Sequence, residues 1–150
     1  MKFSVEPATH VEEERLVALM LEFDRHFGVV HLDMEGAISA LRGLIAAPEY
    51  GQAWIIKAND QAVGYMAITF GYSLEFCGRI AWFDELFVLE EHRGKGLGSL
   101  ALDTGRAFCR TRGVKALMLE LDKTNLKAGK LYERLGFEHR HKYQTWVAVL

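Results

Sequence analysis

The chain has 150 residues, half of them apolar and a quarter charged, and its formal net charge is −2 at pH 7. A chain of this length buries roughly two thirds of the surface that its unfolded form exposes, so we expect one domain over residues 1–150. The slight excess of acids argues against a nucleic-acid binder, and the absence of any apolar run near ~18 residues predicts a cytoplasmic protein without membrane contact.

The first fifty residues predict one strand and two helices. A short strand is expected over residues 3–6. Thr9 stands three residues before a glutamate, the spacing of a capping box, and apolar residues then recur at helical intervals up to Gly28. A second helix is expected from about Asp33 until Pro48, which cannot continue it.

The middle of the chain changes to the alternation of strands. Residues 53–58 and 63–70 predict two strands joined by a turn at residues 59–60, which are Asn and Asp. Residues 80–88 predict a third long strand, antiparallel to its predecessor if the intervening loop reverses the chain. The result is an antiparallel meander.

The last third of the chain alternates helices with strands. A third helix is expected over residues 97–113 and a strand over 116–121, which is parallel to the preceding strand because a helix separates them. A fourth helix follows over residues 125–136, and two short strands are expected around Phe137 and over 143–150. The sequence therefore predicts an α/β (α+β) fold, with a mixed, mostly antiparallel sheet of six or seven strands and four helices.

A glycine-rich turn joins the third long strand to the third helix. Arg93, Gly96 and Gly98 have the spacing R-x-x-G-x-G, and Gly94 and Lys95 lie between them. Glycines let backbone N–H groups converge on phosphate oxygens, and a following helix directs its dipole at the same place. This layout predicts a pyrophosphate-binding turn.

Other interpretations of the turn remain open at this point. A P-loop is excluded in its usual form, because no glycine is followed four residues later by Gly-Lys-Ser/Thr. A dinucleotide fingerprint fits poorly, because its third glycine would fall on Ser99 and the upstream antiparallel hairpin is the wrong neighbour. The remaining alternative is a tight turn without a ligand.

Two segments resemble the GNAT superfamily of N-acetyltransferases. Residues 85–98 carry its R-x-x-G-x-G acetyl-CoA signature, and NLKAGKLYERLGF, residues 125–137, matches its N-x-x-A-x-x-x-Y-x-x-x-G-F pattern. The segment FDELFV is also similar to one in spermidine/spermine N-acetyltransferases. The expected order of elements agrees with the superfamily over nearly the whole chain.

The resemblance implies acetyl-CoA as co-substrate and assigns its contacts. In the family the strand before the turn carries a bulge and splays from the next parallel strand, and the pantetheine arm lies in the gap. The implied acetyl-CoA-binding residues are Leu86, Phe87, Val88, Arg93, Gly94, Lys95, Gly96, Leu97, Gly98, Asn125 and Tyr132.

Three side chains are candidates for proton transfer. A lysine-like amine requires about 4.6 kcal/mol to lose its proton at pH 7, so a base is needed. Asp84 and Glu85 precede the expected thioester site, and strand alternation places them on opposite faces. The resemblance to polyamine enzymes favours Asp84. Tyr132 matches the family tyrosine near the thioester sulfur, where a phenol can donate a proton.

The function predicted is acetyl transfer to a primary amine by direct attack in a ternary complex. A polyamine or other small amine is the favoured acceptor, and a protein lysine or N-terminus is the alternative, as is a non-catalytic acyl-CoA-binding regulator. Cys109 falls on the third helix, away from the strand gap, so no covalent acyl intermediate is expected. We expect no metal site. A homodimer is compatible with the resemblance, because many relatives pair through sheet edges.

Overall fold

A computed structural model describes residues 1–28 and 30–150. The chain divides into two compact units, Met1–Glu120 and Leu121–Leu150, which are described separately. The elements of the first unit are β1 (Phe3–Pro7), η1 (His10–Glu12), α1 (Glu13–Phe27), α2 (Met34–Ala46), β2 (Gly51–Ala58), β3 (Gln61–Ser73), β4 (Gly78–Val88), η2 (Glu90–His92), α3 (Leu97–Thr111) and β5 (Ala116–Leu119). The second unit contains α4 (Leu126–Arg134).

The five strands form one sheet in the order β1-β2-β3-β4-β5. The first three pairings are antiparallel and β4 pairs with β5 in parallel; the sequence predicts the last three of these four pairings, and the pairing of β1 with β2 is added by the structure. Asn59 and Asp60 have φ values of 48° and 67°, the geometry of a type I′ turn, which explains the tight reversal between β2 and β3. The fold class is confirmed as a mixed α+β architecture.

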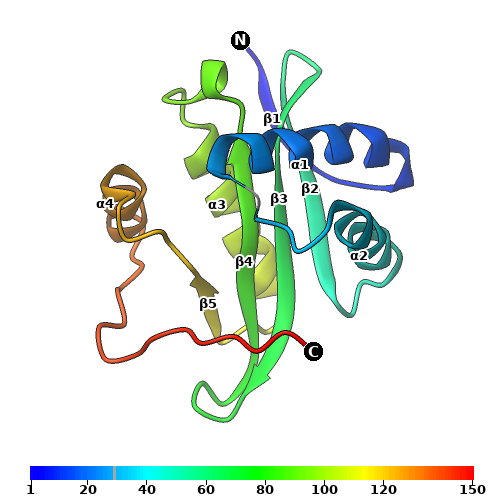
Figure 1. Cartoon of the computed structure of the whole chain (residues 1–150). Helices are drawn as coiled ribbons and strands as arrows, with labels where there is room; N and C mark the ends of the chain where they lie inside the picture. Colours follow the sequence, from blue (N-terminus) through cyan, green and yellow to red (C-terminus); the bar gives the residue numbers. More distant parts are fainter. Residues whose placement is uncertain (29) are drawn as a thin grey trace. The chain divides into compact units, whose positions relative to one another are not determined.

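Helices cover both faces of the sheet (Figure 1). The capping box at Thr9 is present and starts η1, which leads directly into α1. Helices α1 and α2 share one core with β2, β3 and β4, and its fully or nearly buried members include Leu16, Ile55 and Phe87. On the other face Trp54 of β2 meets Phe108 of α3, with ring centroids 4.9 Å apart.

The predicted strand count is too high. Within the described residues the sheet has five strands, and neither Phe137 nor residues 143–150 belong to a strand. The apolar run at the end of the chain has the composition of a strand, but Trp146 and Val147 are each 87% exposed. Composition alone does not make a strand, because a strand needs a hydrogen-bonded neighbour and none pairs with this segment in the described part of the chain.

Candidate active site

The glycine-rich turn lies between η2 and α3. Gly94 and Gly96 have φ values of 71° and 84°, in the left-handed region that glycine adopts without strain. Gly96 is the N-cap of α3, no side chain caps this helix end in the described structure, and no acid occupies its first turn. A Cβ added at either glycine would meet nothing within 4 Å. The turn therefore offers free backbone donors and open space, which fits a pyrophosphate.

Leu97 and Gly98 form the first turn of α3, so they belong to the helix and present its N-terminal amides. The side chain of Leu97 is 2% exposed and anchors the turn in the core. Both residues thus place their backbone N–H groups at the N-terminal end of α3.

The two cations of the turn are engaged with their own surroundings. Arg93 donates from Nε to the carbonyl oxygen of Val88 at 2.8 Å, and its Nη1 lies 2.9 Å from Nε2 of His26 on α1. Lys95 donates from Nζ to the carbonyl oxygen of Glu91 at 2.9 Å. These side chains hold the shape of the turn and keep positive charge beside it, and the backbone N–H groups of the turn are the donors that a phosphate could reach.

The edge of β4 opens just before this turn. Pairing with β5 covers Ile80–Phe83 and ends there, whereas β4 continues to Val88. The backbone of residues 84–88, which includes Leu86, Phe87 and Val88, extends beyond the parallel ladder. The expected parallel pair is present, and because its ladder ends at Phe83, the edge of β4 beyond this residue has no partner from β5.

A β-bulge at Asp84 separates the two acids of β4. Ala67 of β3 pairs with Glu85, but the next residue, Ile68, pairs with Phe83, so Asp84 has no partner in the ladder. Phe83 faces α3, because a Cβ on Gly105 would come within 2.6 Å of its ring. Glu85 faces the opposite side, where Tyr65 lies. The bulge therefore delivers Glu85 to the α1 face and leaves Asp84 exposed.

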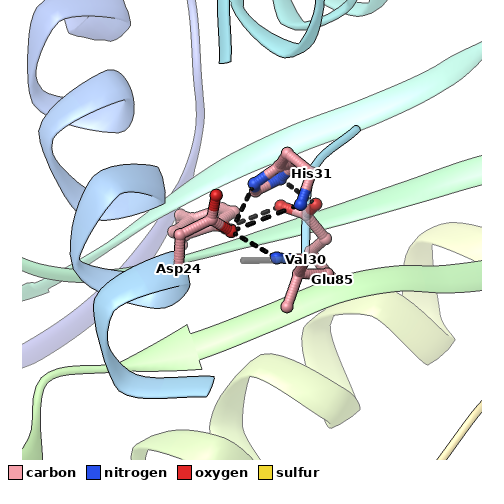
Figure 2. A network of polar contacts seen from close by, with 5 residues as sticks. Asp24, Val30, His31 and Glu85 are labelled. Carbon is pink, nitrogen blue, oxygen red and sulfur yellow. Dashed lines mark hydrogen bonds and ion pairs between the residues drawn. The ribbon is translucent and has the colours of Figure 1, made fainter. Parts of the chain in front are cut away.

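Glu85 is held in a network of polar side chains on the α1 face (Figure 2). Its Oε2 accepts a hydrogen bond from the Tyr65 hydroxyl at 2.6 Å, and its Oε1 lies 2.5 Å from Nε2 of His31. The other ring nitrogen of His31, Nδ1, lies 2.7 Å from Oδ1 of Asp24 on α1. The side chains of His31, Glu85 and Asp24 are 10%, 15% and 15% exposed.

Burial and neighbouring charges act in opposite directions on the pKa values of Glu85 and His31. Burial raises the pKa of Glu85 above its ordinary value, although hydrogen bonds from Tyr65 and the charge of His31 oppose the rise. Burial alone would lower the pKa of His31, but the charges and hydrogen bonds of Glu85 and Asp24 raise it overall.

Sequence reasoning missed the connection between His31, Asp24 and Tyr65. His31 and Asp24 are noticeable as polar residues near a helix junction, but nothing in their spacing links them to a strand 54 residues away. Tyr65 reads as a core residue within an apolar strand, and it is 2% exposed. The sequence shows a group of polar residues after an amphipathic helix, but this pattern does not identify the strand that these residues contact.

The second unit carries the two remaining predicted residues. Asn125 caps α4, where its Oδ1 accepts a hydrogen bond from the backbone N–H of Ala128 at 3.2 Å. Tyr132 is partly buried, its ring centroid is 5.8 Å from that of Phe137, and burial raises the pKa of its phenol. The phenol is therefore neutral and able to donate at neutral pH.

Cys109 is a free, buried cysteine of α3. Burial raises the pKa of Cys109 on α3 to about 11, so its thiol is a poor nucleophile. Among the described residues no three His, Cys, Asp or Glu side chains form a group able to hold a metal ion. In the same part of the chain, no helix combines the length and apolarity needed to cross a bilayer.

Comparison with known proteins supports the same cofactor. The model of the acetyltransferase (GNAT) family matches residues 13–137. The uncharacterized N-acetyltransferase YhfO of Bacillus subtilis is 29% identical over 106 residues, which cover 71% of this chain and 70% of that protein. Two other curated relatives are longer, and the matches span 43% and 33% of their lengths.

Solved structures share the fold over nearly the whole chain. An integron cassette protein from the mobile metagenome of Cole Harbour Salt Marsh is 34% identical, with a TM-score of 0.86 and coverage of 97% of this chain and 90% of that one. An aminoglycoside N-acetyltransferase solved with CoA has a TM-score of 0.82 at 14% identity, covering 98% and 95%. The chain therefore belongs to the acetyltransferase (GNAT) family and is an acetyl-CoA-dependent acyltransferase.

Proposed function

We propose that this enzyme acetylates a primary amine of a small molecule with more than one positive charge, a diamine or polyamine, by direct attack in a ternary complex. The observation that carries the proposal is the position of Glu85 between His31 and Tyr65, beside the exposed Asp84. Acetyl-CoA supplies an activated acetyl group, and the protein must supply an unprotonated amine.

The charges around Glu85 favour a cationic acceptor. Three carboxylates, those of Asp24, Asp84 and Glu85, lie in this region with only His31 as a cation in the network. The side chain of Asp84 makes no hydrogen bond or ion pair with the described residues, and Asp84 is exposed. A free carboxylate next to the base attracts a second ammonium group of the acceptor.

We assign the role of base to Glu85. Both of its oxygens already accept a hydrogen bond, but a carboxylate has about four acceptor sites, so one remains for the amine or a bridging water. Its raised pKa brings it closer to the amine in proton affinity, which favours the transfer. This assignment differs from the choice of Asp84 that the resemblance to polyamine enzymes favours.

Acetyl transfer makes one carbon–nitrogen bond, breaks one carbon–sulfur bond and removes two protons from the nitrogen. The ammonium nitrogen loses one proton to Glu85, which releases it to solvent. The neutral amine then forms a bond to the acetyl carbonyl carbon, the carbon–sulfur bond breaks, and the nitrogen loses its second proton. The leaving thiolate takes a proton from a phenol, a role that the resemblance to the family gives to Tyr132, and the second proton from the nitrogen restores that phenol. Backbone N–H groups at the open edge of β4 support the carbonyl oxygen as negative charge develops on it.

A panel of amines tests the acceptor class. We expect thiol release from acetyl-CoA to be at least tenfold more efficient, in kcat/KM, with 1,4-diaminobutane or spermidine than with butylamine. Butylamine matches the diamine in length but lacks the second ammonium group. Equal rates with butylamine, or a preference for a lysine-containing peptide, would contradict the proposed acceptor.

Tyr132→Phe tests the proton donor. We expect kcat to fall at least tenfold, because the thiolate leaves without a proton, while the acetyl-CoA Kd changes little. Steady-state turnover assays measure kcat, and calorimetry measures the Kd of acetyl-CoA. Tyr143→Phe, the same exchange at an exposed tyrosine of the second unit, serves as the control and should leave both unchanged. An unchanged rate in Tyr132→Phe would remove this residue from the mechanism.

A further inference from the structure

The ring of His31 lies between two carboxylates that come from different elements. Its Nδ1 is 2.7 Å from Oδ1 of Asp24 on α1, and its Nε2 is 2.5 Å from Oε1 of Glu85 on β4 (Figure 2). An ionised carboxylate only accepts hydrogen bonds. Both ring nitrogens must therefore donate when both acids are ionised, which makes His31 an imidazolium.

Asp24 fixes where this imidazolium sits. The same Oδ1 that meets the ring also accepts hydrogen bonds from the backbone N–H groups of Val30 and His31, at 3.3 Å and 3.4 Å. These contacts fasten residues 30–31 to the end of α1. The ring of Phe23 lies 5.8 Å from the imidazole and packs against it. The imidazole ring of His31 therefore has little freedom to rotate away from Glu85.

We propose that His31 is a positioning residue for Glu85: held by Asp24, it aims the carboxylate at the acceptor and keeps it ionised, so that it sets the pH above which the enzyme works. The inference rests on the proposed function, in which Glu85 is the base. His31 itself need not touch the acceptor, because it acts through Oε1 of Glu85.

The surrounding charges make this control sensitive to the charge on His31. The groups that face it are Asp24 from α1, Glu85 and Asp84 from β4, and Tyr65 from β3. The pKa of Glu85 is raised by burial, and the charge of His31 is the opposing influence from a cation. Removing that charge lets the pKa of Glu85 rise further, and the base is then protonated at a higher pH.

The decisive variant is His31→Gln. Glutamine can still donate a hydrogen bond to Glu85 from its amide but cannot carry a charge. We expect the acidic limb of the kcat–pH profile to move up by about one to three pH units, the effect of one nearby opposite charge, with the alkaline plateau nearly unchanged. His10→Gln, the same exchange at an exposed histidine of η1, should retain the wild-type profile.

A profile of His31→Gln that superimposes on the wild type would overturn the proposal and leave His31 a purely structural residue. If His31→Gln does not fold, Asp24→Asn replaces it. Its amide oxygen still accepts the two backbone N–H groups but brings no charge to the ring, so the pKa of His31, followed by NMR, should fall in this variant. An unchanged pKa of His31 in Asp24→Asn would count equally against the proposal, because Asp24 would then not hold the imidazolium.

A titration followed by NMR separates this inference from the proposed function. The His31 ring should titrate above its ordinary value of 6.5 in the wild type and at least one unit lower in Glu85→Gln. This readout requires no turnover. Identical titrations would refute the coupling even if the enzyme acetylates amines as proposed, whereas a shifted titration together with full activity of Glu85→Gln would refute the proposed base alone.

Discussion

Replacing Glu85 with glutamine should lower kcat by about 10²–10⁴-fold, the usual contribution of a positioned general base. The exchange keeps the size and hydrogen bonding of the side chain but removes its ability to take the amine proton. Acetyl-CoA affinity should stay within about twofold, because the glycine-rich turn is untouched. Steady-state kinetics with the best acceptor of the amine panel and calorimetry with acetyl-CoA measure the two quantities.

The matched control is Asp84→Asn, the same exchange at the preceding residue. Because Asp84 is exposed at the bulge and has no partner in the described structure, we expect mainly a higher KM for a doubly charged amine and less than a tenfold change in kcat. The reverse result, with Asp84→Asn inactive and Glu85→Gln active, would reinstate the base that the resemblance to polyamine enzymes favours.

Substituting alanine for Gly94 and Gly96 together should weaken acetyl-CoA binding about a hundredfold. Each residue occupies the left-handed region, where a side chain costs about 1–2 kcal/mol. Alanine relieves this strain by changing the turn, and binding must then restore the conformation that directs the N–H groups at the phosphates. The single variant Gly96→Ala should lose about tenfold. Calorimetry gives both constants.

Gly113→Ala provides the matched strain at the other end of α3. Gly113 has a φ of 68° and open space around its Cα, so the exchange costs similar stability. Its thermal midpoint should fall as it does in Gly96→Ala, but acetyl-CoA affinity should not change. If both variants lost affinity equally, the effect would be one of stability and the turn would not be the phosphate site.

Local chemistry made most of the fold predictable. Thr9 and its capping box, the Asn59–Asp60 turn and the cap at Asn125 each act through neighbours in sequence, and each lies where the pattern places it. The parallel arrangement of β4 and β5 follows from the helix between them. The glycine-rich turn was predictable for the same reason, since it depends on the φ angles of a few adjacent residues.

The parts that escaped prediction depend on distant partners. The final apolar run has strand composition but lacks a paired neighbour in the described structure, so the sheet has fewer strands than expected. The contact between His31 and Glu85 spans 54 positions and arises only when the segment after α1 meets β4. The hydrophobic periodicity of the sequence carries no information about a contact over this distance. The sequence identifies Asp84 and Glu85 as candidate bases, but it does not show which of them points to the α1 face of the sheet.

The bulge at Asp84 adds one unpaired residue to β4, so it reverses the face to which each following side chain points. A regular strand with the same residues would turn Asp84 toward Tyr65 and send Glu85 to the α3 side, so the identity of the acid beside His31 depends on a count of backbone residues. Deleting Asp84 would restore the regular ladder and leave Glu85 and Phe87 on their present face. The catalytic acid of such a strand can therefore be assigned from a relative only when the bulges of the two proteins are aligned.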